Sequence, residues 1–176
     1  LPSMKDVYDV VKSRANERNK NYKRKHIKKR IRNRWFRREF FRTEYYRYLY
    51  ELSQFILDVK TLDGKVFNTG DIANDGKPII ISLWATWCKS CILELMAIND
   101  VYEDWVDETG VKVYAISIDD SKTAARVAPF VNGKGWDFEI LQDINSDLKR
   151  ALNIVDIPYL CILNGNGEIV YKHTSY

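Results

Sequence analysis

The sequence has few of the residues that crosslink small proteins or bind metal ions. Of its 176 residues only three are cysteine and two, His26 and His173, are histidine. Three cysteines are too few for a fold that depends on several disulfides. With a single C-x-x-C motif and only two histidines, the sequence has few ligands for a four-coordinate zinc site. We therefore expect neither a metal nor another cofactor.

Long hydrophobic runs are also missing. A membrane-spanning helix needs about 18 consecutive apolar residues, and no such stretch exists. The longest hydrophobic stretch, residues 79–84, has the length of a strand, and no apolar signal-peptide core lies near the first residue. Because residue 1 is Leu rather than Met, we expect a processed or trimmed chain, so export of the full gene product stays open.

The first third of the chain has no glycine, and its only proline is Pro2, which favours helix. Residues 1–54 contain 17 Lys and Arg against 6 Asp and Glu, a net charge of +11, whereas residues 55–176 contain 11 and 18, a net charge of −7. Aromatic residues alternate with Arg from residue 35 to residue 50. This asymmetry predicts a basic, aromatic-rich helical extension over residues 1–53, followed by a globular domain over residues 54–176.

The basic extension is compatible with three partners. It could bind nucleic acid through phosphates, lie on an anionic membrane surface, or pack its aromatic side on its own domain with Arg outward. We favour packing on the domain, keep the anionic surface as an alternative, and expect no nucleic acid.

From residue 54 onward, strand-like and helix-like hydrophobic patterns alternate, which predicts an α/β fold with a mixed sheet flanked by helices. Asp-Gly and Asn-Gly turn signals mark two hairpins. The expected strands are residues 55–59, 66–67, 79–83, 111–118, 136–141, 159–163 and 168–173, and the expected helices are residues 88–105, 121–132 and 147–152.

Two details of the helices are also expected. The helix over 88–105 should turn Leu93, Met96, Ala97 and Val101 toward the core, and Ser121 should act as the N-cap of the helix that follows it.

The chemistry is expected at Cys88-Lys-Ser-Cys91, where a buried strand leads into a helix. Unpaired N–H groups and the helix dipole at such a position stabilise a thiolate, lowering a cysteine pKa from about 8.5 to roughly 3.5–7.5. Cys88 would be the attacking nucleophile, and Cys91, one turn into the helix, would resolve the mixed disulfide. Lys89 adds positive charge beside the nucleophile, and Ser90 adds a hydroxyl group.

The run Trp84-Ala-Thr-Trp-Cys-Lys-Ser-Cys91 resembles the active site of the thioredoxin superfamily and, more narrowly, of the TlpA/ResA-like thiol–disulfide oxidoreductases. Residues 62–65 and 164–170 are similar to the entry and terminal hairpins of that family. Glu94 matches an acidic position of its C-x-x-E-x-P pattern, and Ile157-Pro158 resembles its cis-proline loop. The resemblance covers residues 55–176.

The resemblance implies a thioredoxin-like fold and a reductase of protein disulfides. Its partners would be protein thiols or disulfides and an upstream thiol electron donor, in the periplasm or cell envelope, with a cytoplasmic location left open. Pro158 would be cis, pack against the C-x-x-C motif and present the backbone of Ile157 to an extended substrate. Proton transfer to Cys91 would use Glu94 or water. Trp84 and Trp87 would pack against the active-site helix, and Trp87 would be able to contact substrate as well.

The sequence departs from the family pattern at several positions. Ser90 replaces the proline common before the second cysteine, Met96 stands where the pattern has proline, and Ser82 occupies the place of a buried acid in thioredoxin itself. The family normally adds one more helix after the position of Tyr176, so we expect the final helix to be absent.

Other functions stay open. A peroxiredoxin-like peroxidase needs T-x-x-C, whereas Thr86-Trp-Cys88 is T-x-C. A tryparedoxin-like enzyme is closer, and a binding module using the basic extension with a vestigial active site is a third alternative. We also expect Cys161 to be a buried, inert cysteine, and Asp119-Asp120 to be a cation site or, more simply, the loop that starts a helix.

Overall fold

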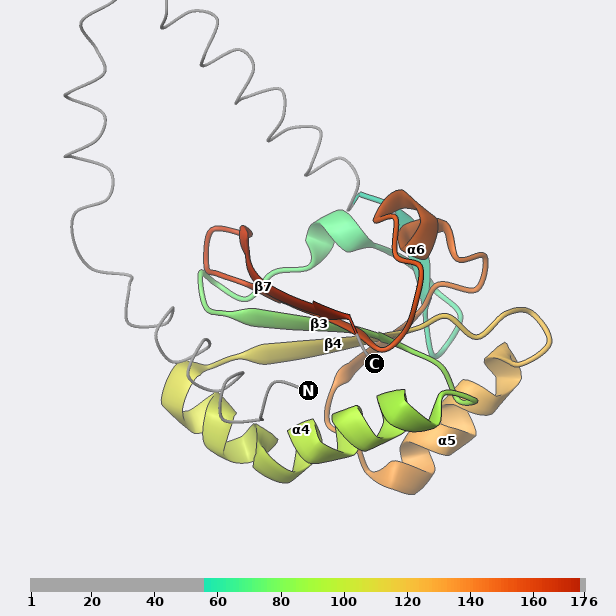
Figure 1. Ribbon diagram of the computed structural model, residues 1–176, viewed down its shortest axis with the longest axis horizontal. Helices are drawn as coiled ribbons and strands as arrows, with labels where there is room; N and C mark the ends of the chain where they lie inside the picture. Colours follow the sequence, from blue (N-terminus) through green and yellow to red (C-terminus); the bar gives the residue numbers. More distant parts are fainter. Residues whose placement is uncertain (1–55, 175–176) are drawn as a thin grey trace, which may run out of the picture.

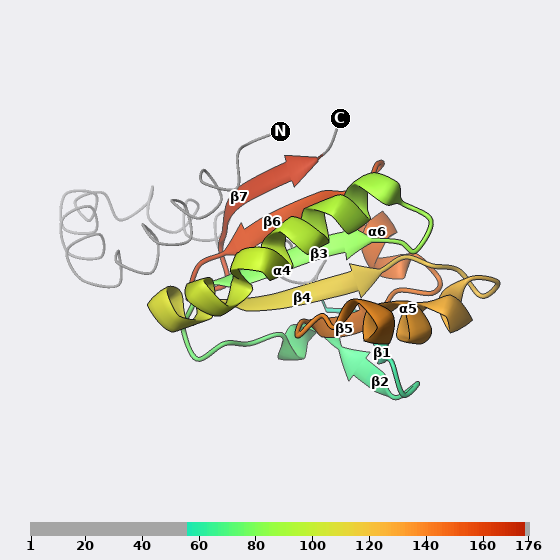
Figure 2. The same cartoon turned by 90° about the horizontal axis from the view of Figure 1, so that it is seen from below.

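The computed structural model describes residues 56–174, so the predicted extension over residues 1–53 lies outside the described residues. The described part is a seven-stranded sheet with helices on both faces. Helices α4 and α5 cover one face and α6 lies on the other (Figures 1 and 2). This confirms the expected mixed, thioredoxin-like sheet.

The chain enters the sheet through a hairpin formed by β1 (Asp58–Thr61) and β2 (Val66–Asn68), followed by a 3-10 turn, η1 (Thr69–Asp71). β1 begins three residues later than the sequence predicts, and Phe55 lies outside the described residues. Gly64 takes φ +82 in the connecting turn, a conformation that favours glycine.

The centre of the sheet consists of β3 (Ile79–Trp84), β4 (Lys112–Ser117) and β5 (Glu139–Gln142), which run parallel. All six residues of β3 are buried, as expected for a strand covered on both faces. β6 (Tyr159–Leu163) pairs antiparallel with β3, and β7 (Ile169–Thr174) pairs antiparallel with β6. The strand order is β2-β1-β5-β4-β3-β6-β7.

Helix α4 (Lys89–Thr109) follows β3 and ends at Gly110, whose φ of +64 suits a glycine C-cap. Its buried face differs in part from the predicted one: Leu93 and Met96 are 56% and 39% exposed and Ala97 is half-buried, whereas Val101 packs against the core as expected. Two apolar stripes run along this helix, and the stripe that begins at the buried Cys91 is the one that packs on the sheet. Its buried hydrophobic members are Cys91, Leu95, Ile98 and Trp105.

The helical segment after β4 also differs from the prediction. Ser121 is in a turn, and the carboxylate of Asp120 accepts hydrogen bonds from the backbone N–H groups of Lys122 and Thr123 at 3.0 and 3.2 Å. A 3-10 turn, η2 (Ala124–Arg126), leads into α5 (Val127–Lys134). Pro129 lies in the first turn of α5, where its missing N–H costs no hydrogen bond.

An aromatic cluster joins the sheet to α5. Trp84 lies 5.2 Å from Trp136 and 5.8 Å from Phe130, measured between ring centroids. Trp136 and Phe138 were predicted to begin β5, but their rings pack in this cluster and the strand starts at Glu139. The rings that contact Trp84 thus belong to α5 and to the segment before β5, whereas packing against the active-site helix was expected.

After β5, the short helix α6 (Asp147–Ala151) leads into the loop before β6. The turn between β6 and β7 is closed by a backbone hydrogen bond of 2.9 Å from Gly167 N to Asn164 O, as the Asn-Gly signal predicts. β7 ends at Thr174, the last described residue, so the expected absence of a final helix stays a prediction. Within residues 56–174 no helix has the length and hydropathy needed to cross a bilayer.

Candidate active site

The two cysteines of the C-x-x-C motif form a disulfide at the start of α4, with their Cα atoms 5.3 Å apart. Cys88 is the N-cap of the helix, and its sulfur accepts a hydrogen bond of 3.3 Å from Cys91 N. Cys88 retains 7% exposure, whereas Cys91 is fully buried. Unpaired N–H groups of a helix start stabilise negative charge, so this placement favours Cys88 as the thiolate that meets a substrate.

A tight turn delivers Cys88 to the helix. Cys88 N donates to Ala85 O at 3.0 Å, and Ser90 Oγ lies 3.5 Å from Cys88 Sγ. The side chain of Lys89 is exposed, so it contributes charge near the sulfur from the solvent side.

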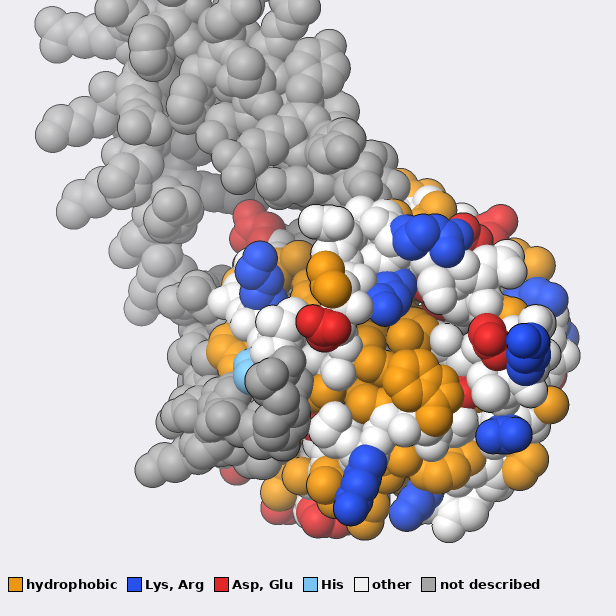
Figure 3. Space-filling view, turned by 45° about the vertical axis from the view of Figure 1, so that its right-hand side comes forward, with side chains coloured by type: hydrophobic (Ala, Val, Ile, Leu, Met, Phe, Trp, Pro, Cys, Tyr) orange, Lys and Arg blue, Asp and Glu red, His pale blue; other side chains and the backbone are white. Residues whose placement is uncertain are grey.

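Trp87 differs from the packing expectation. Its side chain is 61% exposed, next to the disulfide. The face that carries this end of α4 holds a group of hydrophobic side chains with Lys and Arg around it (Figure 3). An exposed apolar surface of this kind is typical of a site that contacts another protein.

The Ile157–Pro158 peptide bond is cis, as predicted. Pro158 is buried and directly precedes β6, whose Tyr159 lies opposite Leu83 of β3. This register brings Pro158 to the level of the loop that leads from β3 to Cys88. The motif and the proline, 70 positions apart in the sequence, therefore meet at one end of the sheet.

Glu94 lies one turn after Cys91 on α4 and is half-buried. Burial raises its pKa from 4.5 to about 7, and the neighbouring Ser82 hydroxyl opposes the rise. That hydroxyl forms no regular hydrogen bond with it: Ser82 Oγ and Glu94 Oε2 are both buried without a partner among the described residues. A carboxyl group that titrates near neutrality can both accept and return a proton.

Asp119, expected as a cation ligand or as part of a loop that starts a helix, has a role that its sequence context does not reveal. Its side chain is fully buried. The carboxylate accepts hydrogen bonds from Thr86 N at 2.8 Å, Thr86 Oγ1 at 2.6 Å and Ser117 Oγ at 2.7 Å. Its hydrogen bonds therefore serve the loop before Cys88, and within residues 56–174 no group of three or more His, Cys, Asp or Glu could hold a metal ion.

Cys161 takes no part in this arrangement. It is fully buried on β6, and burial raises its pKa to about 12. A thiol with this pKa is unreactive at neutral pH, which agrees with the expected inert role.

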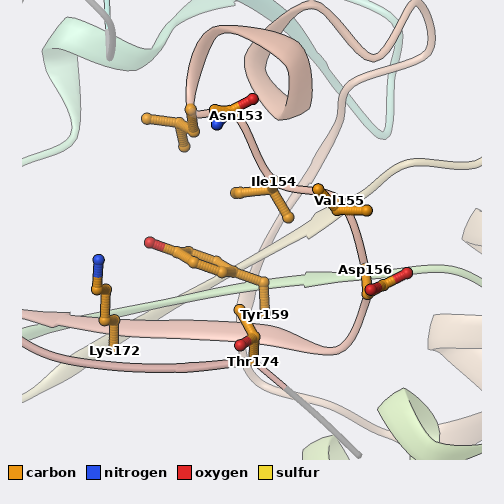
Figure 4. Close-up of a pocket in the computed structure, with 8 residues that line it drawn as sticks. Asn153, Ile154, Val155, Asp156, Tyr159, Lys172 and Thr174 are labelled. Carbon is orange, nitrogen blue, oxygen red and sulfur yellow. The ribbon is translucent and has the colours of Figure 1, made fainter.

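A cavity of about 490 Å³ adjoins the loop before Pro158. In Figure 4 the ring of Tyr159 and the side chain of Lys172 rise from neighbouring strands toward the segment that carries Ile154. Val155 and Asp156 line this cavity and directly precede Ile157, so one wall of the cavity and the cis-proline loop belong to the same segment of the chain.

The chain is similar in sequence to curated proteins that are named as thiol–disulfide oxidoreductases or interchange proteins. It is 27% identical over 128 residues to the thiol-disulfide oxidoreductase ResA of Oceanobacillus iheyensis, covering 61% of this chain and 65% of that protein. It is 28% identical over 122 residues to the thiol:disulfide interchange protein DsbE of Yersinia pestis, covering 69% of this chain and 61% of that protein. The chain thus spans a little under two thirds of the length of these curated relatives.

Two solved structures are similar to this chain in sequence and in fold. A thioredoxin-like protein from Porphyromonas gingivalis shares 50% identity and a TM-score of 0.63, covering 69% of this chain and 79% of that one. StoA from Bacillus subtilis shares 26% identity and a TM-score of 0.54, with 67% and 86% covered. A model of the AhpC/TSA family matches residues 52–172, which include the disulfide, the cis-proline loop and all of the sheet except the last two residues of β7. The chain therefore belongs to the AhpC/TSA family, in its thioredoxin-like form.

Proposed function

We propose that this protein is a thiol–disulfide oxidoreductase that reduces disulfides of other proteins through Cys88 and Cys91. The observation that carries the proposal is the position of this disulfide, at the N-terminus of α4 and level with the cis-proline loop. The names of the curated relatives support the same class of reaction.

In the reduced protein, the Cys88 thiolate attacks one sulfur of a substrate disulfide, and the other substrate sulfur leaves as a thiolate. Cys91, as a thiolate, then attacks Cys88 Sγ, which releases the second substrate sulfur and forms the Cys88–Cys91 disulfide. Two electrons pass to the substrate in one cycle, and a donor dithiol must restore the reduced pair.

Glu94 is suited to take the proton from the Cys91 thiol in the second step. It lies three residues further along α4, and its pKa of about 7 matches a proton acceptor that works near neutral pH. Because Ser82 occupies the position of the buried acid, no carboxyl group on β3 itself can perform this step.

Trp87 and the backbone of Ile157 are suited to hold an extended substrate segment beside Cys88. Trp87 offers an exposed apolar surface, and Ile157 is half-buried directly before the cis bond. Lys89 and Ser90 complete the surroundings of the sulfur. The substrates would be cysteine-containing proteins, and we place the reaction in the periplasm or cell envelope, with the extension over residues 1–53 packed on the domain or on an anionic surface.

The test is reduction of insulin disulfides by the protein in the presence of dithiothreitol. Cys88→Ser should abolish the activity, and Cys91→Ser should accumulate a mixed disulfide with a substrate peptide, visible by mass spectrometry. Cys161→Ser is the matched control, since Cys161 is buried away from the motif, and should retain activity. Full activity of Cys88→Ser would refute the proposal.

The direction of electron flow is tested by the reduction potential of the pair. A value near roughly −270 mV, as in thioredoxin, supports a reductase, whereas a value near roughly −120 mV, as in DsbA, would identify an oxidant. Peroxidase activity is not favoured, because the Thr86 hydroxyl donates to Asp119 and so is occupied away from Cys88.

A further inference from the structure

Asp119 is a buried carboxylate that accepts hydrogen bonds from the active-site turn, residues 85–88. It follows β4, and the pairing of β3 with β4 continues to it: Ser117 lies opposite Trp84, and Ile118 N donates to Trp84 O at 2.8 Å. Asp119 N in turn donates to Ser117 Oγ at 3.0 Å. The carboxylate is therefore held on the rigid end of the sheet, beside the point where the chain leaves β3 for Cys88.

The turn itself depends on this carboxylate. Its outer end is closed by the hydrogen bond from Cys88 N to Ala85 O. Thr86 lies inside the turn, and both its backbone N–H and its hydroxyl donate to Asp119. A buried N–H without a partner is costly, so Asp119 both satisfies Thr86 and fixes the path of the chain into Cys88.

The same carboxylate places a negative charge near the sulfur pair. Asp119 Oδ2 is 2.8 Å from Thr86 N, and the two residues from Thr86 to Cys88 add at most about 7 Å. The sulfur lies beyond the Cys88 backbone, so a separation of about 12 Å with an effective dielectric constant of about 20 disfavours a thiolate about tenfold. Lys89 and Glu94 are the other titratable groups nearest to this sulfur in the chain, and Lys89 opposes the effect.

We propose that Asp119 is a positioning residue that holds the active-site turn through Thr86 and biases the Cys88–Cys91 couple toward the disulfide. The proposal rests on the redox function proposed above, because it concerns the same cysteine pair. It adds a determinant of the potential that lies outside the C-x-x-C motif, on a different strand.

The test compares the reduction potentials of the parent and Asp119→Asn, measured by equilibration with glutathione buffers and intrinsic tryptophan fluorescence. The amide keeps the shape and an acceptor for Thr86 N–H but removes the charge. We expect the reduced form to gain up to tenfold, a shift of up to about 30 mV toward a more oxidising potential. We also expect faster alkylation of Cys88 by iodoacetamide at neutral pH.

Asp143→Asn is the matched control. Asp143 is 2% exposed at the end of β5, and its carboxylate accepts from Leu148 N and Lys149 N of α6 at 3.3 and 2.9 Å. Its loss should lower stability and shift the potential less than Asp119→Asn does, because Asp143 lies one strand further from Cys88. An equal shift in both variants, or none in a folded Asp119→Asn protein, would overturn the proposal.

A second variant decides the matter if Asp119→Asn does not fold. Thr86→Val removes the hydroxyl that donates to Asp119 and keeps the negative charge of the carboxylate. The charge is then less compensated, so the reduction potential should become more reducing. The equilibrium between the reduced and disulfide forms should shift by about twofold to threefold. A shift toward a more oxidising potential, or no shift, contradicts the proposal. Failure of the parent pair to titrate at all would instead refute the redox function, and the two failures are thus distinguishable.

Discussion

Replacement of the half-buried acid on α4 gives a sharp test of the electrostatics of the site. In the unfolded chain Glu94 titrates at its ordinary pKa of 4.5, whereas in the folded protein burial raises the pKa to about 7. Glu94→Gln removes the titration and keeps a side chain of nearly the same volume. The measurement is made on the oxidised protein, so that titration of Cys88 and Cys91 does not contribute.

The sign follows from which state holds the proton more tightly. Between pH 4.5 and about 7 the folded state retains the proton that the unfolded state has released, so stability falls as the pH rises through this window. The contribution of Glu94 is complete below the unfolded pKa and lost above the folded one. A difference of this size corresponds to about 3 kcal/mol in the free energy of unfolding.

Urea denaturation at about pH 4 and about pH 8.5 measures the effect, and the two extremes bracket the titration. The stability of Glu94→Gln relative to the parent should rise by about 3 kcal/mol from the low to the high pH. Glu103→Gln, at an exposed glutamate of the same helix, is the matched control and should follow the parent. A relative stability of Glu94→Gln that changes by less than about 1 kcal/mol across the range would refute the reasoning.

Three further predictions concern packing within the domain. Leu95→Ala should cost about 3 kcal/mol of unfolding free energy, because Leu95 is fully buried. Leu93→Ala should cost less than about 1 kcal/mol, because Leu93 is exposed. Equal losses in denaturant titrations would contradict the observed choice of the buried face of α4. Gly165→Ala should destabilise by more than about 2 kcal/mol, since its Cβ would overlap Gly76 O, and a thermal midpoint equal to the parent would contradict this contact. Cys161 should react with Ellman's reagent only after unfolding, because burial raises its pKa to about 12; rapid reaction in the folded, oxidised protein would show that it is accessible.

Much of the site was predictable because its signals are local. A strand-length apolar run followed by Cys-Lys-Ser-Cys places the first cysteine at a helix start, and the structure has Cys88 there as the N-cap. The spacing of the two cysteines suits a disulfide, and the Asn-Gly turn forms the hairpin after β6 as predicted. The proposed roles of Trp87 and Glu94 stay predictions until the variants are measured.

What the linear pattern left open was decided by contacts between segments distant in the chain. Two apolar stripes of α4 have similar spacing, and only packing on the sheet selects the one through Leu95 and leaves Leu93 at the surface. Likewise, Thr86 and Asp119 are 33 residues apart, and only the parallel pairing of β3 with β4 brings them within hydrogen-bond distance. Local sequence sets backbone conformation and spacing, but burial, and with it the charge state of a carboxyl group, depends on what the fold places on the other side.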